Sequence, residues 1–135
     1  MCKARIKALS DKHASVRQQW RERSAYFHDE DTRYLKFLVP AGGRVLELGC
    51  GTGATLAALH PAYGVGVDFS AAMVAVARTQ YPQHTFVAAD IEASTWTATL
   101  DGPFDYIIIV DTIGSLDDCQ ATFTQLHACA DRTRV

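Results

Sequence analysis

The chain has 135 residues, of which 48% are hydrophobic and 21% charged, and its formal net charge is −2. This size and composition fit one soluble globular domain and exclude an intrinsically disordered chain. No apolar run approaches the ~20 residues that cross a bilayer, and the N-terminus has no secretory signal, so we expect a cytoplasmic protein without a membrane partner. The four cysteines form no CxxC pair and the five histidines are scattered, so no metal site is expected.

The charges are unevenly distributed along the chain. Residues 1–36 contain nine Lys or Arg and five Asp or Glu, whereas the remainder contains four basic and ten acidic residues. A basic N-terminal segment could contact nucleic acid, but no aromatic residues cluster with the basic ones. We therefore interpret the basic residues as a solvated helix face and expect no nucleic-acid partner.

The N-terminal part is predicted to be helical. Val16 and Trp20 are four residues apart, as on one face of a helix over residues 11–27. Asp29 is a candidate N-cap of a second helix, which ends before Pro40. We assign residues 1–40 to a helical N-terminal arm and residues 41–135 to a second unit, a ligand-binding α/β domain.

Strand-like and helix-like segments alternate in the rest of the chain, which predicts an α/β fold with a mainly parallel sheet. The segment 104–110 is apolar on both faces and therefore predicts a central strand. The last three residues read as the start of a fifth strand. The predicted strands are 44–48, 63–69, 84–90 and 104–110. The predicted helices are 53–60, 71–80 with Ser70 as its cap, and a last helix that begins after its cap, Asp117 or Asp118, and runs to about residue 130. Residues 91–102 are predicted to form a loop or a short helix.

Three glycines, Gly49, Gly51 and Gly53, directly follow the first predicted strand. A strand, a G-x-G turn and a helix form a site for a nucleotide-type ligand, because glycine lets the ligand approach the backbone and the helix N-terminus offers free N–H groups. Asp68 ends the next strand, where a carboxylate can accept both hydroxyls of a ribose. Alternatively, Asp68 could share the capping of the next helix with Ser70.

Two further acids bear on the charge of the ligand. Glu47 lies two residues before the glycine turn, where it would repel a pyrophosphate and attract a sulfonium or ammonium group. Asp90 ends the third predicted strand and could accept a hydrogen bond from an adenine amino group. S-adenosylmethionine carries all the groups that these acids and Asp68 would recognise. A nicotinamide-dependent oxidoreductase remains an alternative, which the charge of Glu47 disfavours.

Four segments resemble, in order and spacing, the motifs of class I S-adenosylmethionine-dependent methyltransferases. They are VLELGCGTG (45–53), VGVDFS (65–70), FVAADIE (86–92) and FDYIIIVDTIGSLDD (104–118). The resemblance covers roughly residues 20–135 and implies a Rossmann-like doubly wound sheet with strand order 3-2-1-4. In that family the sheet continues into a fifth strand and two more, so we expect the chain to be the N-terminal part of a domain that lacks its C-terminal half.

The resemblance also implies which residues surround the cofactor. Met73 and Ile91 belong to this set, although both could instead be ordinary core residues. Glu47 is added to the set because of its charge. The other members, in the order of the parts of the ligand, are Gly49, Cys50 and Gly51 at the methionine, Asp68 at the ribose, Phe69 and Met73 at the adenine faces, Asp90 and Ile91 at the adenine edge, and Val110 and Asp111 at the transferred methyl group.

The methyl acceptor is less defined than the cofactor. Many small-molecule methyltransferases of this family have a histidine after the fourth strand, where this chain has Ser115, so no catalytic residue is assigned. A weaker resemblance, to bacterial methyltransferase domains joined to or beside glycosyltransferases, implies a small-molecule or saccharide acceptor and a link to a glycosyltransferase. Two functions stay open: a methyltransferase, or a non-catalytic S-adenosylmethionine-binding scaffold or regulatory module.

Overall fold

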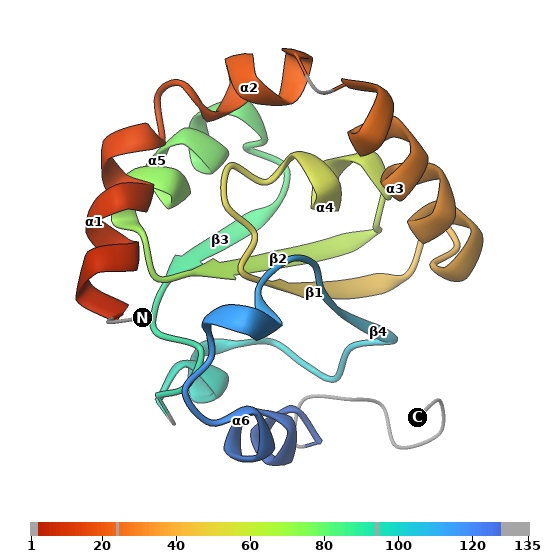
Figure 1. Cartoon of the computed structure of the whole chain (residues 1–135). Helices are drawn as coiled ribbons and strands as arrows, with labels where there is room; N and C mark the ends of the chain where they lie inside the picture. The colour runs from red at the N-terminus through yellow and green to blue at the C-terminus, as the bar shows by residue number, and fades with distance from the viewer. Residues whose placement is uncertain (1–2, 24, 94, 128–135) are drawn as a thin grey trace.

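A computed structural model describes residues 3–23, 25–93 and 95–127 of the chain (Figure 1). Helices and strands alternate from residue 44 onward, as predicted. The α-helices are α1 (Lys3–His13), α2 (Arg17–Arg23), α3 (Ala25–Leu38), α4 (Ala54–Ala58), α5 (Ala71–Gln80) and α6 (Cys119–Leu126); the strands are β1 (Arg44–Leu48), β2 (Tyr63–Asp68), β3 (Thr85–Ala88) and β4 (Tyr106–Ile109); and the 3₁₀ helices are η1 (Trp96–Thr99) and η2 (Ile113–Ser115).

The four strands form one parallel sheet in the order β3-β2-β1-β4. This confirms the predicted Rossmann-like fold class and strand order. In the register of the sheet, Leu48 of β1 lies beside Val67 of β2 and Ile109 of β4, so the carboxyl ends of all strands share one edge. The chain winds in opposite directions on the two sides of β1, and ligands bind at such a switch point in open α/β sheets.

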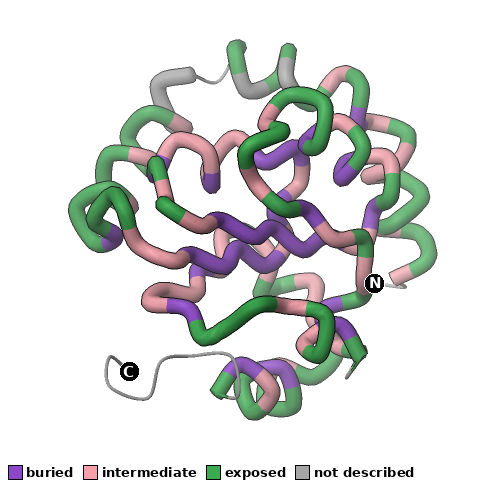
Figure 2. The backbone as a smooth tube through the Cα atoms, turned by 180° about the vertical axis from the view of Figure 1, so that it is seen from behind, coloured by how far each residue is buried: buried purple, intermediate pink, exposed green. Residues whose placement is uncertain are grey.

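Both faces of the sheet are covered, and side chains alternate between them. Helices α4 and α5, with α1, α2 and α3 outside them, lie on one face, and α6 lies on the other (Figure 1). Along β1, Val45 packs with residues of α4 and α5, whereas Leu46 and Leu48 pack with Trp96 and Leu126 on the opposite face. The two central strands, β1 and β2, are consequently the most buried part of the molecule (Figure 2).

The N-terminal arm differs from the prediction of one helix over residues 11–27. The chain forms α1 and α2 instead, separated by a turn in which the Val16 N–H donates to the His13 carbonyl at 3.1 Å. The turn buries Ala14 and brings the rings of His13 and Trp20 to 5.0 Å from each other. The prediction was wrong because α1 has a weak apolar face and is positioned by tertiary contacts with α5.

Local cap signals were accurate at some helices and not at others. Ser70 caps α5 by accepting the Met73 N–H at 3.2 Å, as predicted. Asp118, one of the two predicted candidates, caps α6 by accepting the Ala121 N–H at 2.9 Å. Asp29 does not cap a helix, because α3 begins at Ala25 and runs through it. A cap residue in a helix interior is tolerated when tertiary packing fixes the helix start elsewhere.

Strand β4 lies at one edge of the described sheet, not at its centre. Its isoleucines at 107 and 109 are only half-buried, whereas every residue of β1 after Arg44 is buried. The fifth strand predicted for residues 133–135 falls outside the described residues. No helix within the described ranges is long and apolar enough to cross a bilayer.

The amino edge of the sheet is held together by Arg44. Its guanidinium lies 4.4 Å from the ring centre of Tyr63, and its Nε donates to the Pro103 carbonyl at 2.9 Å. Its backbone N–H donates to the Asp105 carboxylate at 3.0 Å, and the Asp105 N–H donates back to the Arg44 carbonyl at 2.9 Å. These contacts join β1, β2 and the segment before β4 at the end of the sheet opposite to the predicted site.

Candidate cofactor and methyl-transfer site

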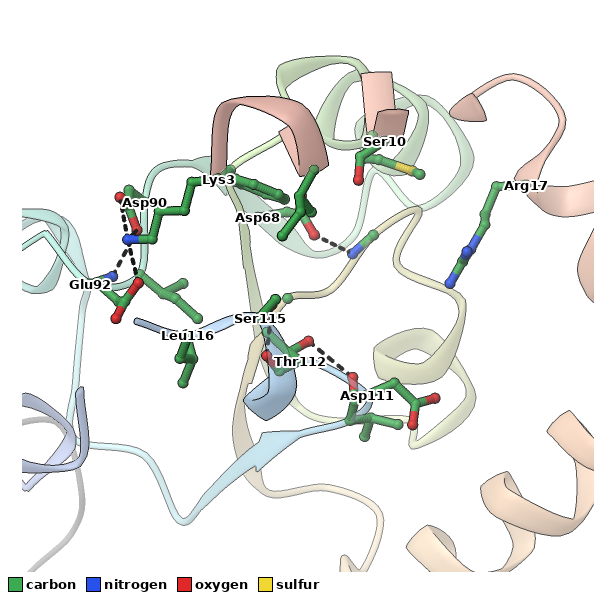
Figure 3. Close-up of a pocket in the computed structure, with 17 residues that line it drawn as sticks. Lys3, Ser10, Arg17, Asp68, Asp90, Glu92, Asp111, Thr112, Ser115 and Leu116 are labelled. Atoms are coloured by element: carbon green, nitrogen blue, oxygen red, sulfur yellow. Dashed lines mark hydrogen bonds and ion pairs between the residues drawn. The ribbon is translucent and has the colours of Figure 1, made fainter. Parts of the chain in front are cut away.

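A cavity of about 240 Å³ opens at the carboxyl edge of the sheet, between α1 and the segments that follow the strands (Figure 3). Helix α1 contributes Lys3, Ile6 and Ser10 to its wall. The structure brings nine of the eleven predicted cofactor-binding residues to this cavity: Gly49, Gly51, Asp68, Phe69, Met73, Asp90, Ile91, Val110 and Asp111.

The remaining two predicted residues, Glu47 and Cys50, line a second cavity of about 70 Å³. Helix α3 forms the opposite wall of this cavity. Arg17, from α2, lines both cavities, and so do Gly49, Gly51, Val110 and Asp111. The two cavities therefore meet at the glycine turn.

Gly49 and Gly51 are needed in the glycine turn for different reasons. Gly49 has φ 73°, and a Cβ there would lie 2.0 Å from Oγ1 of Thr112. Gly51 has φ 53°, and a Cβ there would meet no atom within 4 Å. Gly49 is thus required by the protein's own packing, whereas Gly51 keeps open the space in which a ligand would lie.

Asp68 is buried and ties the glycine turn to the start of α5. Its Oδ2 accepts the Gly51 N–H and its Oδ1 accepts the Ser70 N–H, both at 2.9 Å. Burial raises the pKa of Asp68, although these two N–H groups and the charge of Arg17 act in the opposite direction. The shared capping role considered from the sequence is therefore present. It does not preclude ribose binding, because each carboxylate oxygen has a second lone pair.

Glu47 and Cys50 are both buried behind the glycine turn. Burial, followed by the negative charges of Glu47 and Asp68, raises the pKa of the Cys50 thiol well above its usual range. Cys50 is therefore a protonated, unreactive thiol at neutral pH, and it can only line the site. Its sulfur lies so close to β2 that a Cβ at Gly66 would be 2.7 Å from it.

Asp90 has a partner that the sequence did not reveal. The ammonium group of Lys3 lies 3.1 Å from Oδ2 of Asp90 and also forms an ion pair with Glu92 (Figure 3). Lys3, Arg17 and Thr112 all line the cavity beside α1 and were not predicted. Only Thr112 belongs to a motif noticed in the sequence. Lys3 and Arg17 belong to the N-terminal arm, whose helix bounds were predicted wrongly.

The segment after β4 has a strained backbone beside the cavity. Asp111, which lines both cavities, has φ 56°, an uncommon value for a residue other than glycine. Ser115 donates its hydroxyl to the Thr112 carbonyl at 2.7 Å, which makes it a structural residue of η2. This agrees with leaving Ser115 without a catalytic role.

One face of α3 turns three polar side chains toward the second cavity. His28, Asp31 and Thr32 line it together with Leu35, as the three- and four-residue spacing of a helix allows. Among the described residues, His28 is the only histidine that lines either cavity. No group of metal-ligating side chains was found among the described residues.

A sequence model of a family described as a methyltransferase domain matches residues 45–132, which is more than half of the chain. The chain belongs to this methyltransferase family. Membership confirms the resemblance to S-adenosylmethionine-dependent methyltransferases and the predicted cofactor, S-adenosylmethionine.

Two curated methyltransferases are similar in sequence. The chain is 38% identical to malonyl-[acyl-carrier protein] O-methyltransferase of Bacillus cytotoxicus over 103 residues, which are 72% of this chain and 34% of that protein. It is 49% identical to trans-aconitate 2-methyltransferase of Escherichia coli over 51 residues, 35% of this chain and 20% of that protein. The chain thus matches about a third of the length of the first relative and a fifth of the second.

Solved methyltransferase structures share the fold. CalS10, an amino pentose methyltransferase from Micromonospora echinaspora with S-adenosylmethionine bound, superposes with a TM-score of 0.68 at 25% identity, covering 87% of this chain and 52% of CalS10. A TehB-like S-adenosylmethionine-dependent methyltransferase from Corynebacterium glutamicum gives a TM-score of 0.70 at 21% identity, covering 88% and 67%.

The described residues fit S-adenosylmethionine chemically. Gly51 leaves open space at the turn, Asp68 offers a buried carboxylate to hydroxyl donors, and Met73 and Ile91 provide apolar walls. The alternative that Met73 and Ile91 are core residues is compatible with this arrangement, because both are buried and both line the cavity.

Proposed function

We propose that the protein transfers a methyl group from S-adenosylmethionine to a neutral or cationic small molecule, with an amino sugar or other saccharide as the leading class. The supporting observation is the second cavity, which adjoins the cofactor cavity at the glycine turn. Three carboxylate residues line it, Asp31, Glu47 and Asp111, against the one cation of Arg17. This balance disfavours an acidic acceptor and favours one with hydroxyl or amino groups.

In this proposal, residues of complementary charge or hydrogen-bonding capacity lie at each end of the cofactor. Asp68 accepts hydrogen bonds from the ribose hydroxyls, and Glu47 supplies negative charge on the side of the cationic groups. S-adenosylmethionine supplies an electrophilic methyl group on a positively charged sulfur. The other proposed contacts are Gly49, Cys50 and Gly51 along the methionine, Phe69 and Met73 at the adenine faces, Asp90 and Ile91 at its edge, and Val110 and Asp111 beside the methyl group.

His28 is the proposed proton acceptor for a hydroxyl-bearing acceptor. It lines the second cavity from α3, and Asp31 follows one helical turn later on the same face. A base is needed only when the acceptor must lose a proton as it is methylated. Ser115 cannot take this role, because its hydroxyl already donates within η2.

The proposal is tested by calorimetry with S-adenosylhomocysteine, followed by transfer of a labelled methyl group to amino sugars, neutral sugars and dicarboxylates. We expect binding, and turnover of the sugars in preference to the dicarboxylates. His28→Gln should keep the affinity for S-adenosylhomocysteine within about twofold and reduce turnover of hydroxyl acceptors by ~10²-fold or more. His127→Gln, on the exposed residue that follows α6, is the matched control.

The outcomes separate the alternatives. Binding of S-adenosylhomocysteine without turnover of any acceptor would favour the non-catalytic module. Binding of NAD in its place would favour an oxidoreductase and reject the proposal. The link to a glycosyltransferase and the strands expected beyond residue 135 remain predictions from the sequence alone.

A further inference from the structure

Helix α1 is attached at both of its ends to the segments that form the cofactor cavity. At its start, Lys3 Nζ forms an ion pair with Glu92 and lies 3.1 Å from Asp90 Oδ2. At its end, the carboxylate of Asp11 accepts a hydrogen bond from the Ser70 hydroxyl at the start of α5. The residues between these two attachments include Ile6 and Ser10, which line the cavity.

The carboxylates that receive Lys3 are themselves held in place. Asp90 Oδ1 accepts the Glu92 N–H at 3.0 Å, and Glu92 Oε1 accepts the Asp118 N–H at 2.6 Å. A third carboxylate, Asp117, lies 3.7 Å from Lys3 Nζ. The ammonium group is therefore bound at a prepared acidic site on the far side of the cavity mouth, not by a single mobile side chain.

The ionisation of this cluster agrees with its geometry. The hydrogen bond to Glu92 raises the pKa of Lys3 to about 12, although partial burial acts against it. Burial alone would raise the pKa of Glu92, but hydrogen bonds from Lys3 and from the backbone N–H groups of Asp118 and Asp117 lower it overall. Lys3 and Glu92 are therefore both charged over the physiological pH range, so their ion pair does not depend on pH there.

We propose that Lys3 is a positioning residue that holds α1 closed over the cofactor cavity, and that a ligand enters or leaves only when Lys3 separates from Asp90 and Glu92. The inference rests on the assignment of this cavity to S-adenosylmethionine. Lys3, Ile6 and Ser10 form part of the cavity wall, so α1 lies over the cavity while Lys3 is paired with the carboxylates. The ion pairs therefore oppose entry as well as release.

The test measures the association and dissociation rate constants of S-adenosylhomocysteine with the full chain by stopped-flow fluorescence. Lys3→Met should raise both rate constants about three- to tenfold, the range expected for a partly exposed cluster of charge pairs. The dissociation constant should stay within about twofold, because the ion pairs stabilise the closed free and closed bound states alike. Lys3→Arg should restore the wild-type rates.

A matched control and a second readout make the result specific. Lys7→Met removes an exposed lysine of the same helix for which no contact with the three carboxylates is found, and it should leave both rates unchanged. Amide hydrogen exchange over residues 3–13 should be faster in Lys3→Met without ligand. Lys3→Gln serves as a second variant if Lys3→Met folds poorly.

Three outcomes would overturn the inference. Unchanged rate constants in Lys3→Met would show that α1 does not limit passage. Faster release with unchanged association, and hence weaker affinity, would show that Lys3 contacts the ligand directly. Absence of S-adenosylhomocysteine binding by the wild type would instead reject the assignment of the cavity, and with it the proposed function.

Discussion

The two sides of the cofactor cavity are built in different ways. On the β1–β2 side, a glycine turn and Asp68 form the wall through backbone conformation and backbone hydrogen bonds of buried groups. On the α1 side, the wall is held by ion pairs between partly exposed side chains, with Lys3 31% and Asp90 45% exposed. Buried backbone contacts are rigid and insensitive to salt, whereas exposed ion pairs are weaker and screened. The β1–β2 side can therefore fix the shape of the bound ligand, while the α1 side can open.

Substitution at the glycines should break the rigid side most strongly. Gly49→Ala places a Cβ against Thr112 in a left-handed backbone, and should lower the free energy of unfolding by about 3 kcal/mol or more. Denaturant unfolding would measure this loss.

Gly51→Ala is the matched comparison, since its Cβ meets no protein atom. It should cost only about 1–2 kcal/mol of stability, from the left-handed backbone, but reduce the affinity for S-adenosylhomocysteine about tenfold. Equal stability losses in Gly49→Ala and Gly51→Ala would contradict the distinction between packing and ligand space.

Asp68→Ala should have the next largest effect. It removes a charged acceptor for the ribose and leaves the N–H groups of Gly51 and Ser70 without their carboxylate. The expected loss is ~1.5–3 kcal/mol of cofactor binding, about tenfold or more in affinity, as measured by calorimetry. Glu30→Ala, on the exposed surface of α3, is the control. Equal affinity in wild type and Asp68→Ala would reject the proposed ribose contact.

The raised pKa of Asp68 predicts a smaller, pH-dependent effect. Because its pKa in the folded protein is above that in the unfolded chain, the carboxylate that accepts the ribose hydroxyls is lost as pH falls through the raised value. Below that pKa the affinity should fall, by no more than the loss in Asp68→Ala, and this fall should begin at a higher pH than for an ordinary aspartate.

The same shift has the opposite consequence for stability. The folded chain binds this proton more tightly than the unfolded chain, so the contribution of Asp68 to the unfolding free energy decreases as pH rises between the two pKa values. Calorimetric titrations at several pH values, with Asp68→Asn as the non-titrating control, would check the binding part. An identical pH profile in Asp68→Asn would assign the effect to another group.

Salt should produce the smallest change, and only on the α1 side. Raising NaCl from about 50 mM to about 500 mM shortens the screening length well below the size of the cavity, and should speed the association of S-adenosylhomocysteine about twofold. In Lys3→Met this acceleration should disappear. Persistence of the full salt effect in that variant would place its origin elsewhere.

The β1–β2 side of the cavity was largely predictable from the sequence, whereas the α1 side was not. The glycine turn and Asp68 were predicted from the residues at the ends of two predicted strands, and the cap Ser70 from its place before a helix-like segment. The strand order with its switch point was implied by the family resemblance of the same motifs. The roles of the cofactor-binding residues remain predictions.

The α1 side could not be predicted from the sequence. Lys3 meets Asp90 across 87 residues, and nothing in either local segment marks that pairing. The lysine instead contributed to a basic segment that was interpreted as solvated surface. His28 was likewise not predicted from the sequence, because its position beside the second cavity depends on where α3 packs.

The Arg44 cluster at the amino edge has a consequence for engineering this protein. Arg44, Tyr63, Pro103 and Asp105 bind one another, and none of them lines either cavity. Tolerance to sequence change can therefore be increased at this edge without altering ligand selectivity. Directed evolution toward a new methyl acceptor would start best from a variant reinforced around Arg44, which could then absorb destabilising changes at the opposite edge.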